Sequence, residues 1–171
     1  ARDLTPGLLP IEEIARAPLT FEVVARPFEW IGVALGEIVD ASSMTGGCFL
    51  FNSTAFSLTR LMTGQLAASI DIGNRLLRDF PAGRERFLAL GFGRPIGLFA
   101  YDIAAAALIA QEAGAVVTDA YGNSLDGTRL LDTSEPNLQS ILSASNAVLH
   151  ERLLAAINTG MGRLQINASD Q

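Results

Sequence analysis

The sequence contains no lysine, one cysteine and one histidine, and each scarcity excludes something. The net charge of −6, with arginine as the only basic side chain apart from histidine, disfavours nucleic-acid binding, which needs a basic surface. A single cysteine, Cys48, excludes an internal disulfide bond, and we interpret it as a buried, inert thiol. A single histidine, His150, excludes a two-histidine metal site, and we expect it on an exposed turn of the last helix. No membrane span is expected, because Asp102 interrupts the longest apolar stretch, residues 97–110.

Charged residues are also scarce, at 18% of the sequence against 49% apolar residues. With 171 residues the chain is long enough to bury a core, and we predict a single domain over residues 1–171. The apolar excess exceeds what one core needs, so we expect a protein partner to cover part of the surface. The amino end carries Asp3 and Pro6 and does not read as a signal peptide, so the expected location is cytoplasmic.

Hydrophobic patterning predicts alternating strands and helices without an internal repeat. The predicted strands are residues 21–26, 30–39, 48–51, 66–72, 115–118 and 139–143. The predicted helices are a short turn at residues 12–15, a helix between the cap Asn52 or Ser53 and Gly64, a helix at residues 103–113, and a closing helix from about Ser145.

The most informative segment is residues 101–119, which combine a carboxylate, a helix of small residues and a strand. Asp102 lies at or just before the first helical turn, where free N–H groups and the helix dipole favour its ionised form. Gly114 is the left-handed residue that ends the helix, and a buried strand follows. Asp102 is therefore an anion placed to bind a metal ion, or simply a cap of its helix.

This segment resembles the Trp-Asp-x-Ala-Ala/Gly and Glu-Ala-Gly-Gly motifs of the inositol monophosphatase-like, magnesium-dependent phosphatases. Tyr101 stands in place of the Trp and Ala115 in place of the final Gly. The resemblance covers about residues 45–158 and includes residues 52–55, 119–126 and 143–150. It implies an α/β fold, a layered α/β/α arrangement with a mixed parallel and antiparallel sheet, as in the C-terminal domain of the sugar-phosphatase fold.

The resemblance also implies roles for four residues. Asp102 would be a ligand of Mg²⁺, and Asp71 would accept hydrogen bonds from substrate hydroxyls. Ser53 and Thr54 would face the substrate at a helix start, where backbone N–H groups suit an anion. The bound partner would be a phosphorylated small molecule, such as an inositol phosphate, a sugar bisphosphate or a phosphoadenosine nucleotide. Without the resemblance, Asp71 is equally a strand end, and Ser53 and Thr54 are helix caps.

Two further motifs of the family, a Glu-Glu pair and an Asp-Pro-Ile/Leu-Asp-Gly-Thr loop, belong to its first half and do not occur in this sequence. Residues 125–128, Leu-Asp-Gly-Thr, follow the strand instead of preceding it, and we predict that they form a turn. We therefore expect the C-terminal half of a phosphatase, without the N-terminal metal-binding domain, without a catalytic residue of its own and inactive alone.

Activity and Mg²⁺ binding would then need the missing half, as a further segment or as a separate subunit, and a homodimer is a second form of assembly to consider. The alternative function is a non-catalytic interaction or regulatory domain that retains the fold. A purely parallel sheet would instead favour an unrelated doubly wound ligand-binding domain.

Residues 72–101 separate the two acidic positions by far more residues than the family needs, so we interpret them as an insertion. We predict a short helix and an ordered excursion there. The segment contains five arginines: Arg75, Arg78, Arg84, Arg86 and Arg94. We expect these arginines either to bind an anionic substrate or to lie on a solvated surface, where they pair with Asp79 and Glu85.

Overall fold

The computed structural model describes residues 5–169, with side chains to residue 166. The strands are β1 (Leu19–Phe21), β2 (Cys48–Phe49), β3 (Ala68–Asp71), β4 (Val116–Thr118) and β5 (Ile141–Ala144). The α-helices are α1 (Phe28–Ser42), α2 (Thr54–Met62), α3 (Gly73–Asp79), α4 (Arg84–Leu90), α5 (Ala100–Glu112) and α6 (Ala147–Ser169). Three short 3₁₀ helices, η1 (Ile14–Arg16), η2 (Pro81–Gly83) and η3 (Glu135–Asn137), complete the described elements.

All five strands form one mixed sheet in the order β2-β1-β3-β5-β4. β1 is parallel to both β2 and β3, with Leu19 in register with Cys48 and with Ala68. β5 is antiparallel to β3 and to β4. The mixed sheet confirms the predicted fold class and argues against the purely parallel, doubly wound alternative.

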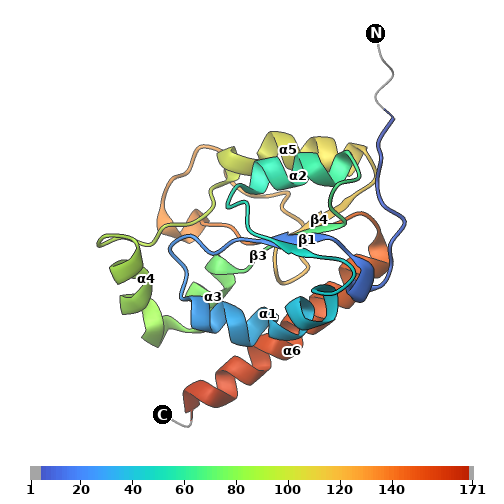
Figure 1. Cartoon of the computed structure of the whole chain (residues 1–171). Coiled ribbons are helices and arrows are strands. Elements are labelled where there is room, and N and C mark those ends of the chain that lie inside the picture. Colours follow the sequence, from blue (N-terminus) through green and yellow to red (C-terminus); the bar gives the residue numbers. More distant parts are fainter. Residues whose placement is uncertain (1–4, 170–171) are drawn as a thin grey trace.

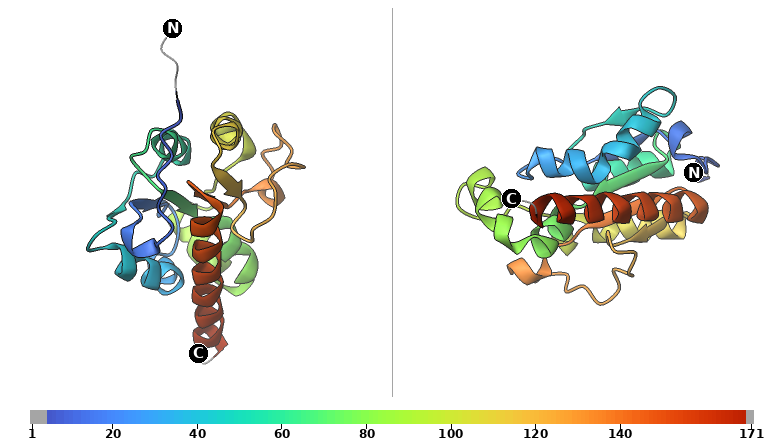
Figure 2. Two further views of the ribbon diagram at one scale, coloured as in Figure 1. Left: turned by 90° about the vertical axis from the view of Figure 1, so that its right-hand side faces the viewer. Right: turned by 90° about the horizontal axis from the view of Figure 1, so that it is seen from below.

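Helices cover both faces of the sheet, which gives the predicted α/β/α layers (Figure 1). The crossover between β1 and β2 contains α1, and the crossover between β2 and β3 contains α2 on the opposite face. One core, which includes Ile31, Leu35 and Leu153, lies on the side of α1 and α6. The other core, which includes Leu58 and Ile103, lies on the side of α2 and α5. Seen from below, α6 runs beside α1 (Figure 2).

The prediction of a strand over residues 30–39 is wrong, because this segment belongs to α1. The buried residues Ile31, Ala34, Leu35 and Ile38 recur at spacings of three and four, which places them on one face of a helix. The prediction followed the apolar content of the segment and missed this period.

The prediction for residues 21–26 is correct only at its start, because β1 ends at Phe21. Ala25 adopts φ 55°, a left-handed conformation that interrupts an extended strand, and Pro27 follows shortly after. Residues 22–26 therefore form a loop at the carboxyl end of β1. The other predicted strands and helices are present with shifted ends, and Gly114, at φ 95°, follows α5 as expected.

The segment of residues 72–101 is ordered and helical, as predicted, with α3, η2 and α4 at one end of the sheet (Figure 1). Arg75 pairs with Asp79 at 3.4 Å, as expected, but its side chain is buried and does not lie on a solvated surface. The expected role of Glu85 is not seen, because Arg84 pairs with Glu135. That the segment is an insertion relative to the family remains a prediction.

His150 is buried, with 6% of its surface exposed, so the prediction of an exposed turn is wrong. It lies in the first turns of α6, where Nε2 is 2.8 Å from Oγ1 of Thr118. Cys48 is half-buried, not buried. The turn predicted at residues 125–128 is present, with the N–H of Thr128 donating to the carbonyl oxygen of Leu125 at 3.2 Å. Among the helices that the structure describes, none is long and apolar enough to cross a membrane.

Candidate functional site

A cleft of about 360 Å³ lies where β1 and β3 end and where α2 and α5 begin. Parallel strands present their carboxyl ends at the same edge of a sheet, so the loops after β1 and β3 meet there. The lining residues are Glu22, Val24, Arg26, Asn52, Ser53, Thr54, Ala55, Asp71, Ile96, Gly97, Leu98 and Asp102. All four residues that the sequence nominated, Ser53, Thr54, Asp71 and Asp102, line this one cleft.

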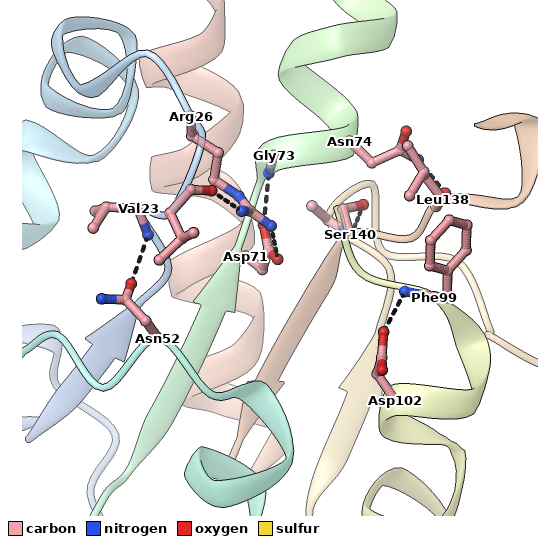
Figure 3. Close-up of polar contacts among 12 residues, drawn as sticks. Val23, Arg26, Asn52, Asp71, Gly73, Asn74, Phe99, Asp102, Leu138 and Ser140 are labelled. Atoms are coloured by element: carbon pink, nitrogen blue, oxygen red, sulfur yellow. Dashed lines mark hydrogen bonds and ion pairs between the residues drawn. The ribbon is translucent and has the colours of Figure 1, made fainter. Parts of the chain in front are cut away.

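Asp71 forms a buried ion pair with Arg26 at the base of the cleft (Figure 3). Nε of Arg26 donates to Oδ1 of Asp71 at 3.0 Å, and Nη2 donates to Oδ2 at 2.5 Å. Oδ1 also accepts the backbone N–H of Gly73 at 2.7 Å. Only 1% of the Asp71 side chain is exposed. Both carboxylate oxygens therefore already have partners, and a role in binding substrate hydroxyls remains a prediction from the resemblance.

Glu22 is the second buried carboxyl group in the cleft, with 5% of its surface exposed. Its Oε1 has no hydrogen-bond partner among the described residues. Burial, followed by the nearby charge of Asp71, raises the pKa of Glu22 to about 7. Arg26, the Ser53 backbone and the Thr54 hydroxyl act in the opposite direction on this pKa. At neutral pH Glu22 is thus divided between its acid and carboxylate forms, which is characteristic of functional sites.

The first turn of α2 forms one wall of the cleft. Asn52 adopts φ 51° and its Oδ1 accepts the backbone N–H of Val23 at 3.2 Å, which ties the chain before α2 to the loop after β1 (Figure 3). Ser53 is the N-cap, yet its side chain makes no cap hydrogen bond. Thr54 is buried. The Ser53 backbone and the Thr54 hydroxyl hydrogen-bond to the Glu22 carboxyl group. The N–H groups that follow Ser53 in this turn are not consumed by a Ser53 side-chain cap and suit an anionic ligand.

Asp102 lies in the first turn of α5, at the opposite wall of the cleft (Figure 3). Its Oδ2 accepts the backbone N–H of Phe99 at 3.0 Å, which is a capping interaction. The side chain is exposed, and within the described part of the chain its hydrogen bond is made through Oδ2 and not through Oδ1. Asp102 therefore caps its helix and still presents a carboxylate oxygen to the cleft.

The described residues do not by themselves fit a magnesium site. No group of three or more histidine, cysteine, aspartate or glutamate side chains in residues 5–166 is placed to hold a metal ion. Magnesium needs oxygen ligands in an octahedral array, and Asp102 supplies one carboxylate. The role of Asp102 as a metal ligand thus remains a prediction that needs further ligands from elsewhere.

A larger cleft, of about 660 Å³, lies between α1, η2 and α4, away from these residues. Trp30 and Phe80 line it, together with charged residues that are already paired. Arg86 pairs with Glu29 over the ring of Trp30, and Asp79 pairs with Arg75 and accepts the Tyr121 hydroxyl. This cleft therefore offers no open titratable group. None of the five arginines of residues 72–101 lines the smaller cleft, so they do not face the candidate site.

Sequence reasoning missed Glu22, Arg26 and Asn52. The prediction of a strand over residues 21–26 gave no reason to place Glu22 and Arg26 in a site. The available signal was the position of these two charges shortly before Pro27. A proline often marks the end of a strand, and charged residues at the carboxyl edge of parallel strands face a common crevice.

The model of the inositol monophosphatase family matches residues 33–161. Among solved structures, the chain is similar to the inositol monophosphatase from Anabaena, with 14% identity, a TM-score of 0.57, and coverage of 89% of this chain and 49% of that one. It is also similar to Mycobacterium tuberculosis SuhB, with 20% identity, a TM-score of 0.57, and coverage of 90% and 45%.

A third similar structure is that of SaIMPase-II, described as bound to inositol monophosphate, with 15% identity, a TM-score of 0.56, and coverage of 96% and 51%. The chain thus spans about half the length of the solved structures it matches. No sequence among curated proteins matches it significantly. The structural similarities establish a shared fold, and the family model covers most of the sequence. The chain belongs to the inositol monophosphatase family.

Proposed function

We propose that the chain is the C-terminal half of a magnesium-dependent phosphomonoesterase, that it is inactive alone, and that its cleft binds a phosphorylated small molecule. The observation that carries this proposal is the meeting of Ser53, Thr54, Asp71 and Asp102 in one cleft. These residues come from three separate parts of the chain, and the resemblance assigned each of them to the same site.

The outer surface of α2 and α5 supports the need for another domain. Its exposed large side chains include Phe56 at 43%, Tyr101 at 49%, Leu108 at 59% and Ile109 at 57% exposure. Such a surface is typical of a covered interface. The solved relatives are about twice as long as the part that this chain matches, so they contain the material to cover it. An obligate interface of this kind would bury at least ~2,000 Å².

Asp102 lies on the same helix as three of these exposed side chains, Tyr101, Leu108 and Ile109, and it is itself exposed. A domain that covers α2 and α5 would therefore bring its own groups next to the Asp102 carboxylate. In the proposed enzyme, acids of that domain together with Asp102 would hold Mg²⁺. The first turn of α2 contributes N–H groups for the phosphoryl oxygens.

Two measurements on the 171-residue chain test this proposal. The first is a titration with inorganic phosphate, followed by the amide signals of Ser53, Thr54 and Ala55 in NMR spectra. We expect these signals to move with a dissociation constant in the millimolar range, about −4 kcal/mol. If they do not move, the chain has no phosphate site and the proposal fails.

The second measurement is phosphate release from inositol 1-phosphate with Mg²⁺ present, in the wild type and in Asp102→Asn. We expect no release from the chain alone, because it supplies too few ligands for the ion. Turnover by the wild-type chain that is lost in Asp102→Asn would show a complete active site and would refute the half-enzyme proposal.

The alternative is a non-catalytic interaction domain that retains the fold. The occupied oxygens of Asp71 favour it, since they reduce the capacity of that residue to bind a substrate. Phosphate binding at the first turn of α2 distinguishes the two, because an interaction domain has no need of an anion site there.

A further inference from the structure

Glu22 has a feature that the packing of the protein does not account for. It is 5% exposed, lines the cleft, and has an Oε1 without a partner among the described residues. A buried polar atom without a hydrogen bond destabilises the native state, so natural proteins rarely keep one without a role. The carboxyl group of Glu22 accepts hydrogen bonds from the Ser53 backbone and the Thr54 hydroxyl, and Oε1 is the oxygen that remains without a partner.

Asp71, the neighbouring acid on β3, is in the opposite situation. Its two oxygens accept three hydrogen bonds, two from Arg26 and one from the backbone of Gly73. These contacts indicate that Asp71 is a positioning residue, because they hold Arg26 and the start of α3 in place. Of the two buried acids in the cleft, Glu22 is the one with an oxygen left for a ligand.

The surroundings of Glu22 favour a hydroxyl group as that ligand. The charged groups that face it are Asp71 from β3 and Arg26 from its own loop, which neutralise one another as an ion pair. A phosphate oxygen in direct contact with Oε1 would be repelled by the carboxylate form of Glu22, whereas a hydroxyl both donates and accepts hydrogen bonds. A hydroxyl can therefore pair with Glu22 in either protonation state. From the first turn of α2, the Thr54 hydroxyl and the Ser53 backbone approach the same carboxyl group.

We propose that Glu22 is the specificity-determining residue that binds a carbon-bound hydroxyl group of a phosphorylated polyhydroxy compound held in the cleft. This inference rests on the proposed function, because the phosphate of the same compound is placed at the first turn of α2. Glu22 then takes the task of recognising hydroxyl groups, and Asp71 acts through Arg26 as a positioning residue.

The test compares inorganic phosphate, which has no carbon-bound hydroxyl, with inositol 1-phosphate, which has several. Both are titrated at pH 8 into the wild type, Glu22→Met, Glu22→Gln and Glu112→Met, with NMR detection at Ser53, Thr54 and Ala55. Glu112→Met is the matched control, because it removes the same charge from an exposed position at the far end of α5. The urea midpoint of each variant is measured at the same pH.

We expect the wild type to bind inositol 1-phosphate at least five times more tightly than phosphate. Glu22→Met abolishes this preference but leaves phosphate binding within twofold, Glu22→Gln keeps part of the preference, and Glu112→Met keeps all of it. We also expect Glu22→Met to have a urea midpoint equal to or above that of the wild type, because it removes a buried atom without a partner.

Three results overturn the inference while the proposed function stands: a wild type without the preference, a preference that persists in Glu22→Met, or a urea midpoint lowered by Glu22→Met, which would identify Glu22 as a structural residue. A wild type that binds neither compound overturns the proposed function itself, and this inference with it.

Discussion

The ion pair between Arg26 and Asp71 gives the sharpest prediction about how the cleft is held together. The Arg26 side chain is 6% exposed and the Asp71 side chain 1%. Replacing Arg26 with Met leaves the Asp71 carboxylate buried with only the N–H of Gly73 as a partner. Removing one member of a buried pair typically costs 3–5 kcal/mol, because the remaining charge loses its compensation. We expect Arg26→Met to lower the free energy of unfolding by about 3–5 kcal/mol.

A double-mutant cycle isolates the interaction between the two side chains. Asp71→Asn alone leaves Arg26 without its anion, and we expect a comparable loss. The double variant should be more stable than the sum of the single losses predicts, with a coupling energy of about 1–3 kcal/mol. The assay is urea unfolding at pH 8, followed by the fluorescence of Trp30, the only tryptophan, which packs against Phe80 in the native state.

Arg86→Met is the matched control, because the Arg86–Glu29 pair is half-exposed, with side-chain exposures of 50% and 57%. An exposed pair contributes about 0–1 kcal/mol, so this variant should unfold nearly like the wild type. The reasoning is refuted if Arg26→Met costs no more than Arg86→Met, or if the losses of Arg26→Met and Asp71→Asn simply add.

Three further predictions concern pH and helix packing. The pKa of Glu22 rises from 4.5 to about 7 in the folded protein, so protonation of Glu22 favours the folded state. This contribution to the free energy of unfolding is fully present below pH 4.5 and is lost as the pH rises through 7. Urea unfolding should therefore show Glu22→Gln gaining about 3 kcal/mol over the wild type between pH 4.5 and 8, and a gap independent of pH would contradict this. Burial lowers the pKa of His150, so the wild type loses stability as the pH falls below 6.5, and His150→Gln should remove that part of the loss; the check is the difference between their urea midpoints at pH 5 and pH 7.5. A Cβ on Gly160 would lie 2.0 Å from the Ala34 carbonyl oxygen where α6 crosses α1, whereas a Cβ on Gly162 meets nothing within 4 Å. Thermal unfolding should show Gly160→Ala destabilised by about 1–3 kcal/mol and Gly162→Ala stabilised by about 0.5–1 kcal/mol; equal effects would disprove the close packing.

Much of the candidate site was predictable, because it depends on local signals. Asp102 at a helix start and Gly114 after the helix end are features of neighbouring residues, and the structure has both. Ser53 and Thr54 likewise open a helix, as expected. The family resemblance also predicted that these helix starts belong to one site, and Ser53, Thr54 and Asp102 do line the same cleft.

The failures have two causes: surroundings that come from distant parts of the chain, and a local signal that was given too little weight. His150 is buried against Thr118, which is 32 positions away, and the residues near His150 in the sequence do not indicate that contact. The segment of residues 30–39 contained the correct signal, a helical spacing of buried residues, but its apolar content suggested a strand.

The sequence by itself determined most of the elements and the α/β class, because hydrophobic period, capping residues and glycine positions act over a few residues. It also determined the family, through the match of residues 33–161 to the family model. Only the tertiary structure decided what each acid in the cleft does. Arg26 reaches Asp71 across 45 positions and occupies it, which leaves Glu22 as the buried acid with a free oxygen. The physical reason is that burial and hydrogen bonding, which set the charge and the availability of a carboxyl group, depend on neighbours that only the fold brings together.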